Sequence, residues 1–162
     1  MLKRLEMRNR LGSRREINHL TVRSEKITKP LTLAVFTDMH DGPFEALLPE
    51  LAKCDAILIV GDLVERHSGD YLNGVRFLQA APEVAPTFYA IGNHEWKHPA
   101  WPEYWPQAKK RDVTVLDDRF VEFGGIVLGG LSSRRNPKED VPFVAEMAAR
   151  EEFRLLMCHH PE

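Results

Sequence analysis

The apolar run Leu33–Phe36 is followed by Thr37 and then by the triplet Asp38-Met39-His40. This triplet contains an aspartate and a histidine separated by one residue. A carboxylate and an imidazole are common metal ligands. Residues two apart on an extended chain point to the same side, so both side chains can reach one ion. Alone this pair is a weak signal, because Asp-x-His occurs by chance in many proteins, and the rest of the chain must supply partners.

Three later apolar runs also end in polar side chains that bind metals. The residues that follow them are Asp62, then Asn93 with His94, and then His159. Taken singly, each acid or amide could cap a helix that follows its strand, and each histidine could be buried and hydrogen-bonded. Capping does not call for metal-competent side chains at four successive strand ends, so a shared metal site is the better interpretation.

The elements that must position these side chains alternate between strands and helices. Continuous apolar runs predict buried strands, and apolar residues at helical spacing predict helices between them. The expected strands are 31–37, 56–60 and 87–91, and the expected helices are 44–53 and 71–80. This alternation is typical of an α/β fold with a largely parallel sheet, whose site lies at the carboxyl ends of the strands. We therefore expect the four polar strand ends to converge.

The remaining segments have a different pattern. Short runs at 113–116, 120–123 and 126–131 are separated by Asp117-Asp118 and Gly124-Gly125. These dipeptides are hairpin signals, so this part is predicted to be antiparallel. A helix at 140–152 and a strand at 154–158 complete the domain. Near the N-terminus, short strands are expected at 17–23 and 26–28.

Composition restricts the class of protein. The 162 residues suffice for one domain, and a formal net charge of -2 gives no general attraction for nucleic acid. The two cysteines, Cys54 and Cys158, border apolar runs and are interpreted as reduced and buried. Apolar runs long enough to cross a membrane are absent from the sequence, and a cytoplasmic location is the default expectation. Residues 1–16 form a basic arm, interpreted as solvated, although an arm of this kind also suits phosphate or lipid headgroups and so peripheral membrane association.

The mixture of ligands points to particular metals. Carboxylate, carboxamide and imidazole together suit Mn, Fe or Zn. Two such ions about 3.5–4 Å apart form the clamp that is used to hydrolyse phosphate esters. One carboxylate must then bridge both ions, and Asp62 lies centrally enough in the order of motifs to do so.

The same residues carry a family resemblance. Asp38-Met-His40, Gly61-Asp62-Leu-Val-Glu65, Gly92-Asn93-His94-Glu95 and the final His159-His160-Pro161 resemble the motifs of calcineurin-like metallophosphoesterases, in particular small bacterial phosphohydrolases. The resemblance implies a sheet sandwich flanked by helices. It also implies a metal-dependent hydrolase of phosphate mono- or diesters, with a dinuclear metal centre and a metal-activated water.

The resemblance implies a role for each matching residue. Asp38 and His40 would hold the first metal, Asp62 would bridge, and Asn93 and His159 would hold the second. His94 would not bind metal; it would contact the scissile phosphate and protonate or stabilise the leaving oxygen. Glu95 would not bind metal itself but would orient neighbouring ligands through hydrogen bonds. Glu65 would have the same kind of role, at a position where the family often has Asp or Asn.

The chain departs from the family pattern after His159. The family's Gly-His-x-His motif, which completes both metals, is absent from residues 1–162. His160 is not expected to substitute, because adjacent strand residues point to opposite faces. We therefore expect residues 17–162 to be a C-terminally incomplete domain with weakened metal binding. The alternative is a degenerate, non-catalytic domain that binds metal or phosphate weakly.

The sequence does not identify the phosphate ester. The segments expected to select it are Trp96–Trp105 and Ser132–Arg135, although core packing is the preferred role for the tryptophans. His98 is expected to be an exposed loop histidine. Arg134 or Arg135 could bind a phosphate through two parallel hydrogen bonds. The preferred interpretation is that both are solvent-exposed charges in a loop.

Overall fold

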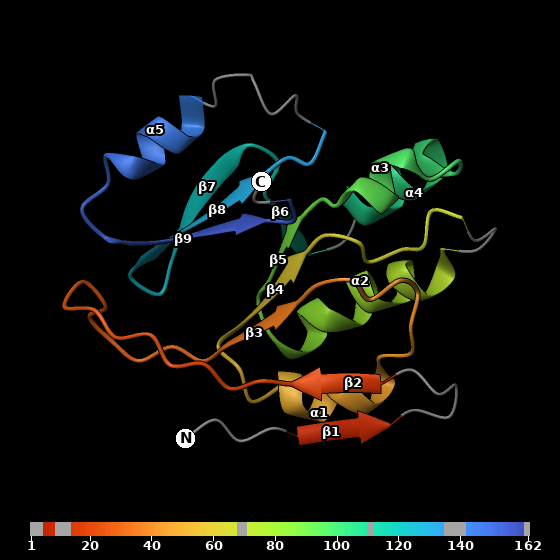
Figure 1. Ribbon diagram of the computed structural model, residues 1–162, viewed down its shortest axis with the longest axis horizontal. Coiled ribbons are helices and arrows are strands. Elements are labelled where there is room, and N and C mark those ends of the chain that lie inside the picture. Colours follow the sequence, from red (N-terminus) through yellow and green to blue (C-terminus); the bar gives the residue numbers. More distant parts are fainter. Residues whose placement is uncertain (1–4, 9–13, 68–70, 110–111, 135–141, 161–162) are drawn as a thin grey trace.

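The computed structural model describes residues 5–8, 14–67, 71–109, 112–134 and 142–160 (Figure 1). Two sheets are stacked face to face, and helices cover the outer face of each. Within the described ranges, no helix combines the length and apolar character needed to cross a membrane.

The main sheet has four parallel strands in the order β3-β4-β5-β6. They are β3 (Leu33–Phe36), β4 (Ala56–Val60), β5 (Thr87–Ala90) and β6 (Val113–Val115). The register pairs Leu33 with Ala56 and Ile57 with Thr87, so the carboxyl ends of the first three strands lie at one edge. The parallel α/β arrangement predicted from the sequence is confirmed.

The second sheet has three strands in the order β7-β8-β9. They are β7 (Arg119–Phe123), β8 (Ile126–Leu131) and β9 (Phe153–Cys158). β7 and β8 form the expected antiparallel hairpin, and the two glycines of its turn, Gly124 and Gly125, have φ values of 61° and 84°. This left-handed conformation costs glycine little, which explains the pair. β9 runs parallel to β8.

Helices follow the strands and cover the sheets. They are η1 (Glu45–Leu47), α1 (Leu48–Leu51), α2 (Leu72–Val84), α3 (Asn93–Lys97), α4 (Trp101–Lys109) and α5 (Pro142–Ala148). α1 and α2 pack together on the main sheet, whereas α5 contacts β7 and β8 of the second sheet. Two short strands, β1 (Leu5–Arg8) and β2 (Arg14–Ile17), pair antiparallel in a separate sheet.

Alternation along β4 divides the interior into two cores. Ile57 and Ile59 join the core under α1 and α2, and Ala56 and Leu58 join the core between the sheets. All four are essentially inaccessible to solvent. A strand buried on both faces reads as a continuous apolar run, which is why the pattern of β4 was visible in the sequence.

Two predictions about strands are wrong. Residues 113–115 were expected to pair antiparallel with the next run, but β6 is parallel to β5 in the other sheet. The turn signal at Asp117-Asp118 therefore marks a crossing between sheets. Residues 18–23 and 26–28 form no strand, and Leu20 of this segment is 84% exposed, so no sheet neighbour covers it. The domain boundary at residue 17 stays a prediction, and most of the basic arm lies outside the described residues.

Phe77 of α2 tests the packing of the core beneath the helices. It is fully buried and its ring contacts those of Phe36 and Phe44. We expect Phe77→Ala to lower the free energy of unfolding by about 3–5 kcal/mol. Leu72→Ala in the same helix removes a side chain that is 60% exposed, and should cost under about 1 kcal/mol. Chemical denaturation followed by circular dichroism measures both, and equal losses would contradict this packing.

Candidate metal centre

Two loops continue side by side beyond the carboxyl ends of β3 and β4. The N–H of Asp38 donates to the carbonyl of Gly61 at 3.3 Å, and the N–H of His40 donates to the carbonyl of Asp62 at 3.0 Å. These bonds extend the parallel pairing past the strands. They bring the Asp-x-His pair of the first loop against the aspartate of the second.

The backbone of these loops is left-handed at four residues that are not glycine. Asp38, His40, Asp41 and Asp62 have φ values of 55°, 46°, 54° and 53°. Each such residue costs roughly 1 kcal/mol or more relative to ordinary backbone. Strain of this kind persists where surrounding contacts hold it, and it gathers at functional sites.

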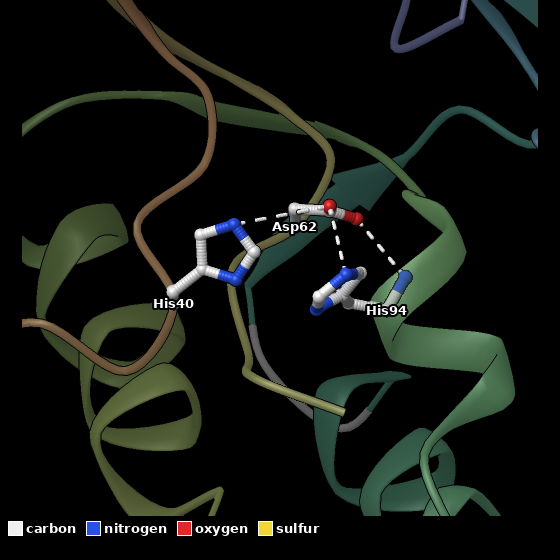
Figure 2. Close-up of side chains that lie close together, drawn as sticks. All are labelled: His40, Asp62 and His94. Carbon is white, nitrogen blue, oxygen red and sulfur yellow. Dashed lines mark hydrogen bonds and ion pairs between the residues drawn. The ribbon is translucent and has the colours of Figure 1, made fainter. Parts of the chain in front are cut away.

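The buried Asp62 carboxylate lies at the centre of the convergent side chains. Its Oδ2 atom lies 3.1 Å from Nε2 of His159, 3.7 Å from Nε2 of His94 and 4.0 Å from Nε2 of His40. Its Oδ1 atom accepts the backbone N–H of His94 at 3.0 Å. Figure 2 shows the His40 and His94 rings directed at this carboxylate from two different segments. The predicted convergence of strand ends is therefore present.

Two groups of three side chains have the geometry to hold a cation, and they share Asp62. One contains His40, Asp62 and His94, and the other contains Asp38, Asp62 and His159. Within each group the potential ligand atoms lie within 4.8 Å of one another. Two carboxylates and three imidazoles suit Mn, Fe or Zn. The grouping differs from the one that the resemblance implies, because Asp38 lies with His159 and His94 lies among the potential ligands.

The electrostatics around Asp62 favour positive charge. A hydrogen bond with Asp62 is the main cause that raises the pKa of His159 to about 9, with support from the Val60 carbonyl, 3.0 Å from Nδ1. Burial by itself would raise the pKa of Asp62, but hydrogen bonds from His159 and from the His94 backbone lower it overall. Asp62 is thus held as a carboxylate that attracts a cation.

His94 is held as a neutral imidazole that can donate a hydrogen bond from Nε2. Burial lowers its pKa, although the charges of Asp62 and Glu65 oppose this effect. Its Nδ1 accepts the backbone N–H of Arg66 at 3.3 Å, which leaves the proton on Nε2, the atom nearer Asp62. The acid role that the resemblance implies requires the ring to carry a second proton, because a histidine gives up a proton as imidazolium and not as neutral imidazole, so that role stays a prediction.

Glu65 lies between the two imidazoles of the first group. Its Oε2 is 3.0 Å from Nδ1 of His40, and its Oε1 is 3.3 Å from Nδ1 of His94. A carboxylate on the far nitrogen of a histidine orients the ring and increases its basicity. Glu65 thus lies beside both rings without a hydrogen bond to His40 Nδ1, and its positioning role stays a prediction.

Glu95 holds the loop that carries Asp62. Its fully buried carboxylate accepts the backbone N–H groups of Asp62 (3.0 Å), Leu63 and Val64 (3.4 Å). Burial raises the pKa of Glu95, and these backbone donors oppose that rise. The expectation that Glu95 orients its neighbours agrees with these contacts.

Two glycines allow the loops to approach this closely. A Cβ atom on Gly92 would lie 2.2 Å from the backbone nitrogen of Asp62, and one on Gly61 would lie 2.6 Å from the His159 ring. Gly61 also has a φ of 74°. The Gly-Asp and Gly-Asn dipeptides of the motifs are thus required by close packing.

His160 does not point away from the site, contrary to the expectation from strand alternation. Its Nε2 lies 2.5 Å from Oδ1 of Asn93, and its ring packs against that of His159 at 4.6 Å between centroids. β9 ends at Cys158, so alternation does not extend to the two histidines. Asn93, the first residue of α3, is therefore placed at the same edge as His159.

Asp41 is a site residue that the sequence analysis missed. Its Oδ2 accepts the N–H of Glu65 at 2.8 Å, and its Oδ1 accepts the N–H of Gly74 in α2 at 3.0 Å. It thereby joins the two loops to the following helix. An acid directly after Asp-x-His was a readable signal, because short acidic side chains commonly bind nearby backbone in turns.

The segments expected to select the ester have other roles in the described structure. Trp101 and Trp105 stack at 4.8 Å and pack against the core under the helices, as preferred. His98 is 4% exposed and accepts the Ala100 N–H, so the expectation of an exposed histidine is wrong. Arg134 forms an ion pair with Asp117, and Arg135 lies outside the described residues.

Comparison with known proteins identifies relatives of this chain. A family model described as calcineurin-like phosphoesterase matches residues 31–162. An uncharacterized metallophosphoesterase of Campylobacter jejuni is 27% identical over 72% of this chain and 33% of its own length. Uncharacterized metallophosphoesterases of two Helicobacter pylori strains are 26% identical over 93% of this chain and 44% of their own length. The chain thus spans less than half the length of these relatives.

Replacement of Glu95 tests whether its carboxylate holds the loop. Gln keeps the shape of the side chain but replaces one acceptor oxygen with a donor that faces backbone N–H groups. We expect Glu95→Gln to lower the free energy of unfolding by about 2 kcal/mol and the affinity for Mn²⁺ by about tenfold or more. Glu83→Gln, at an exposed position of α2, is the matched control. Thermal unfolding and metal titration measure the two effects, and a Glu95→Gln protein as stable as the control would exclude this role.

Proposed function

The chain belongs to the calcineurin-like phosphoesterase family, and we propose that the protein hydrolyses phosphate mono- or diesters at a dinuclear metal centre. The observation that carries the proposal is the sharing of one buried carboxylate, Asp62, by two groups of ligands. Shared ligation would hold two ions close together, an arrangement that two-metal phosphatases and nucleases use.

The proposed ligands are Asp38, His40, Asp62, Asn93 and His159. Asp62 would be shared by the two ions, Asp38 and His40 would hold one of them, and Asn93 and His159 would hold the other. Mn, Fe and Zn all suit this mixture of carboxylate, carboxamide and imidazole. Bound ions would supply Lewis acidity toward the phosphoryl oxygens and lower the pKa of a water nucleophile.

The protein's own groups account for the remaining steps. As an imidazolium, with its Nδ1–H beside the Glu65 carboxylate, His94 would donate its Nε2 proton to the leaving oxygen of the ester and be left as neutral imidazole. Glu95 fixes the Asp62 loop, so that the carboxylate need not reorganise when the ester binds. Preorganisation of this kind lowers the barrier because the structural cost is met in folding.

The alternative is a non-catalytic domain that binds metal or phosphate weakly. It would use the same aspartate and histidine side chains, so metal binding alone does not distinguish it from the proposed function. Activity should therefore be measured on the longest polypeptide that the gene encodes around these residues, with the 162-residue chain beside it. Metal binding without hydrolysis in both proteins would support the alternative.

Asp62→Asn tests the bridging role. The substitution preserves shape and removes the charge that both ligand groups share, so we expect loss of at least one bound ion per molecule. Hydrolysis of a chromogenic phosphodiester should fall about 100-fold or more. Asp112→Asn, at an exposed residue beside the amino end of β6, should leave both unchanged. Elemental analysis and steady-state kinetics measure these quantities, and full activity in Asp62→Asn would refute the assignment.

His94→Ala separates the two roles open to His94. If the residue is the acid, we expect kcat to fall about 10²–10⁴-fold while metal content stays nearly constant. If it is a ligand, as its place beside His40 and Asp62 also allows, metal content falls with activity. Esters whose leaving groups need no protonation should lose less activity in the first case only. His19→Ala, at an exposed residue, is the control.

A further inference from the structure

Two fully buried tyrosines share a hydrogen bond in the core under α1 and α2. Tyr89 belongs to β5 and Tyr104 to α4, and neither side chain is accessible to solvent. Their hydroxyl oxygens lie 2.9 Å apart. A pair of hydroxyls carries two protons, but the bond between them uses only one. The other proton needs a further acceptor, because a buried hydroxyl without a partner costs free energy.

Glu95 supplies the remaining acceptor. Burial is the main cause that raises the pKa of Tyr89 well above its usual value, and the charge of Glu95 and a hydrogen bond with it contribute to the rise. The backbone N–H groups of residues 62–64 already bind this carboxylate. A carboxylate offers about four acceptor positions, so one remains for the Tyr89 hydroxyl.

The chemistry of the carboxylate sets the direction of these hydrogen bonds. An ionised carboxylate only accepts, so Tyr89 donates its single proton to Glu95. The oxygen of Tyr89 then accepts the proton of the Tyr104 hydroxyl. The chain of hydrogen bonds therefore runs from Tyr104 through Tyr89 to Glu95, and it ends at the backbone of the Asp62 loop.

Packing alone does not require the two hydroxyls. The ring of Tyr104 contacts those of Trp101 and Tyr71 at centroid distances of 5.9 Å and 5.8 Å, and a phenylalanine ring would keep both contacts. In a purely apolar core phenylalanine is the less costly residue, because no hydroxyl must then be removed from water. Two buried hydroxyls in series that end at a buried carboxylate thus indicate a role for the hydroxyls themselves.

We propose that Tyr89 and Tyr104 are positioning residues of the metal centre, which act through Glu95. A hydroxyl that is itself held by a second hydroxyl keeps the Glu95 carboxylate in one orientation, and this carboxylate holds the backbone from which Asp62 projects. Hydrogen-bond partners behind the ligands commonly set the affinity of a metal site. The inference rests on the proposed function in one respect, that Asp62 binds metal.

Removal of single hydroxyls tests the proposal. Tyr89→Phe breaks both bonds of the chain, so we expect the affinity of the protein for Mn²⁺ to fall about threefold to tenfold. Tyr104→Phe leaves the bond between Tyr89 and Glu95 intact, and should lower the affinity by under about threefold. Metal titration measures both effects, and circular dichroism at the same temperature shows that each variant is folded.

Tyr71→Phe is the matched control. The hydroxyl of Tyr71 bonds to Glu103 and Gln107 and takes no part in the chain that ends at Glu95. Its removal should leave the affinity for Mn²⁺ unchanged. A Tyr89→Phe protein that binds Mn²⁺ as tightly as this control would overturn the proposal.

A double substitution separates positioning from general stabilisation. If Tyr89 acts through Glu95, Tyr89→Phe added to Glu95→Gln should lower the Mn²⁺ affinity by under about 1.5-fold more than Glu95→Gln alone. Independent effects that multiply in the double variant would overturn the proposal, because Tyr89 would then act by another route.

Nuclear magnetic resonance of the metal-free protein provides a readout that does not depend on metal binding. The two buried hydroxyl protons should exchange slowly enough with water to be observed. Tyr104→Phe should leave the Tyr89 signal far downfield, as donation to a carboxylate requires, whereas Tyr89→Phe should move the Tyr104 signal upfield because its acceptor is lost. The reverse pattern would overturn the direction of the chain and with it the proposal. An unsubstituted protein that binds no Mn²⁺ would instead refute the proposed function and this inference together.

Discussion

The site depends on one buried interaction, the binding of the Asp62 loop by the Glu95 carboxylate. Without it, three successive backbone N–H groups would be buried without a strong acceptor. Such groups cost free energy comparable to a lost hydrogen bond. Because Glu95 belongs to the helix after β5 and Asp62 follows β4, the contact also fixes two neighbouring strand ends relative to each other.

The contacts of Glu95 help to explain how the loops that carry Asp38 and Asp62 keep a strained backbone. Asp38 and Asp62 adopt left-handed conformations in which a continuing strand is impossible, so the chain turns and its carboxylates face the common centre. The two sheets support this turn. Gly61 packs closely against His159, and Gly92 packs closely against Asp62, so the loops cannot shift to an unstrained conformation without a clash. Strain, packing and ligand orientation are therefore aspects of the same arrangement.

Sequence patterns predicted the elements that are buried on both faces and the polar residues at their ends. β4 and β5 were readable because burial on both faces produces uninterrupted apolar runs. The partner of Val113–Val115 was not readable, because a short apolar run fits a hairpin and a parallel border strand equally well. The orientation of His160 was also missed, since alternation applies only while the strand continues.

His159 connects the second sheet to the main sheet at the site. Its ring contacts the carbonyl of Val60 with one nitrogen and Asp62 with the other, so a residue at the end of the second sheet is fastened to the end of β4. A cation held by His159 and Asp62 would tie the two layers of the sandwich together at the ligand edge. Ligands this distant in sequence meet only in the native state, so an ion that binds them selects the folded chain and adds to its stability. Removal of such an ion by a chelator would then weaken the junction between the two sheets as well as empty the proposed site.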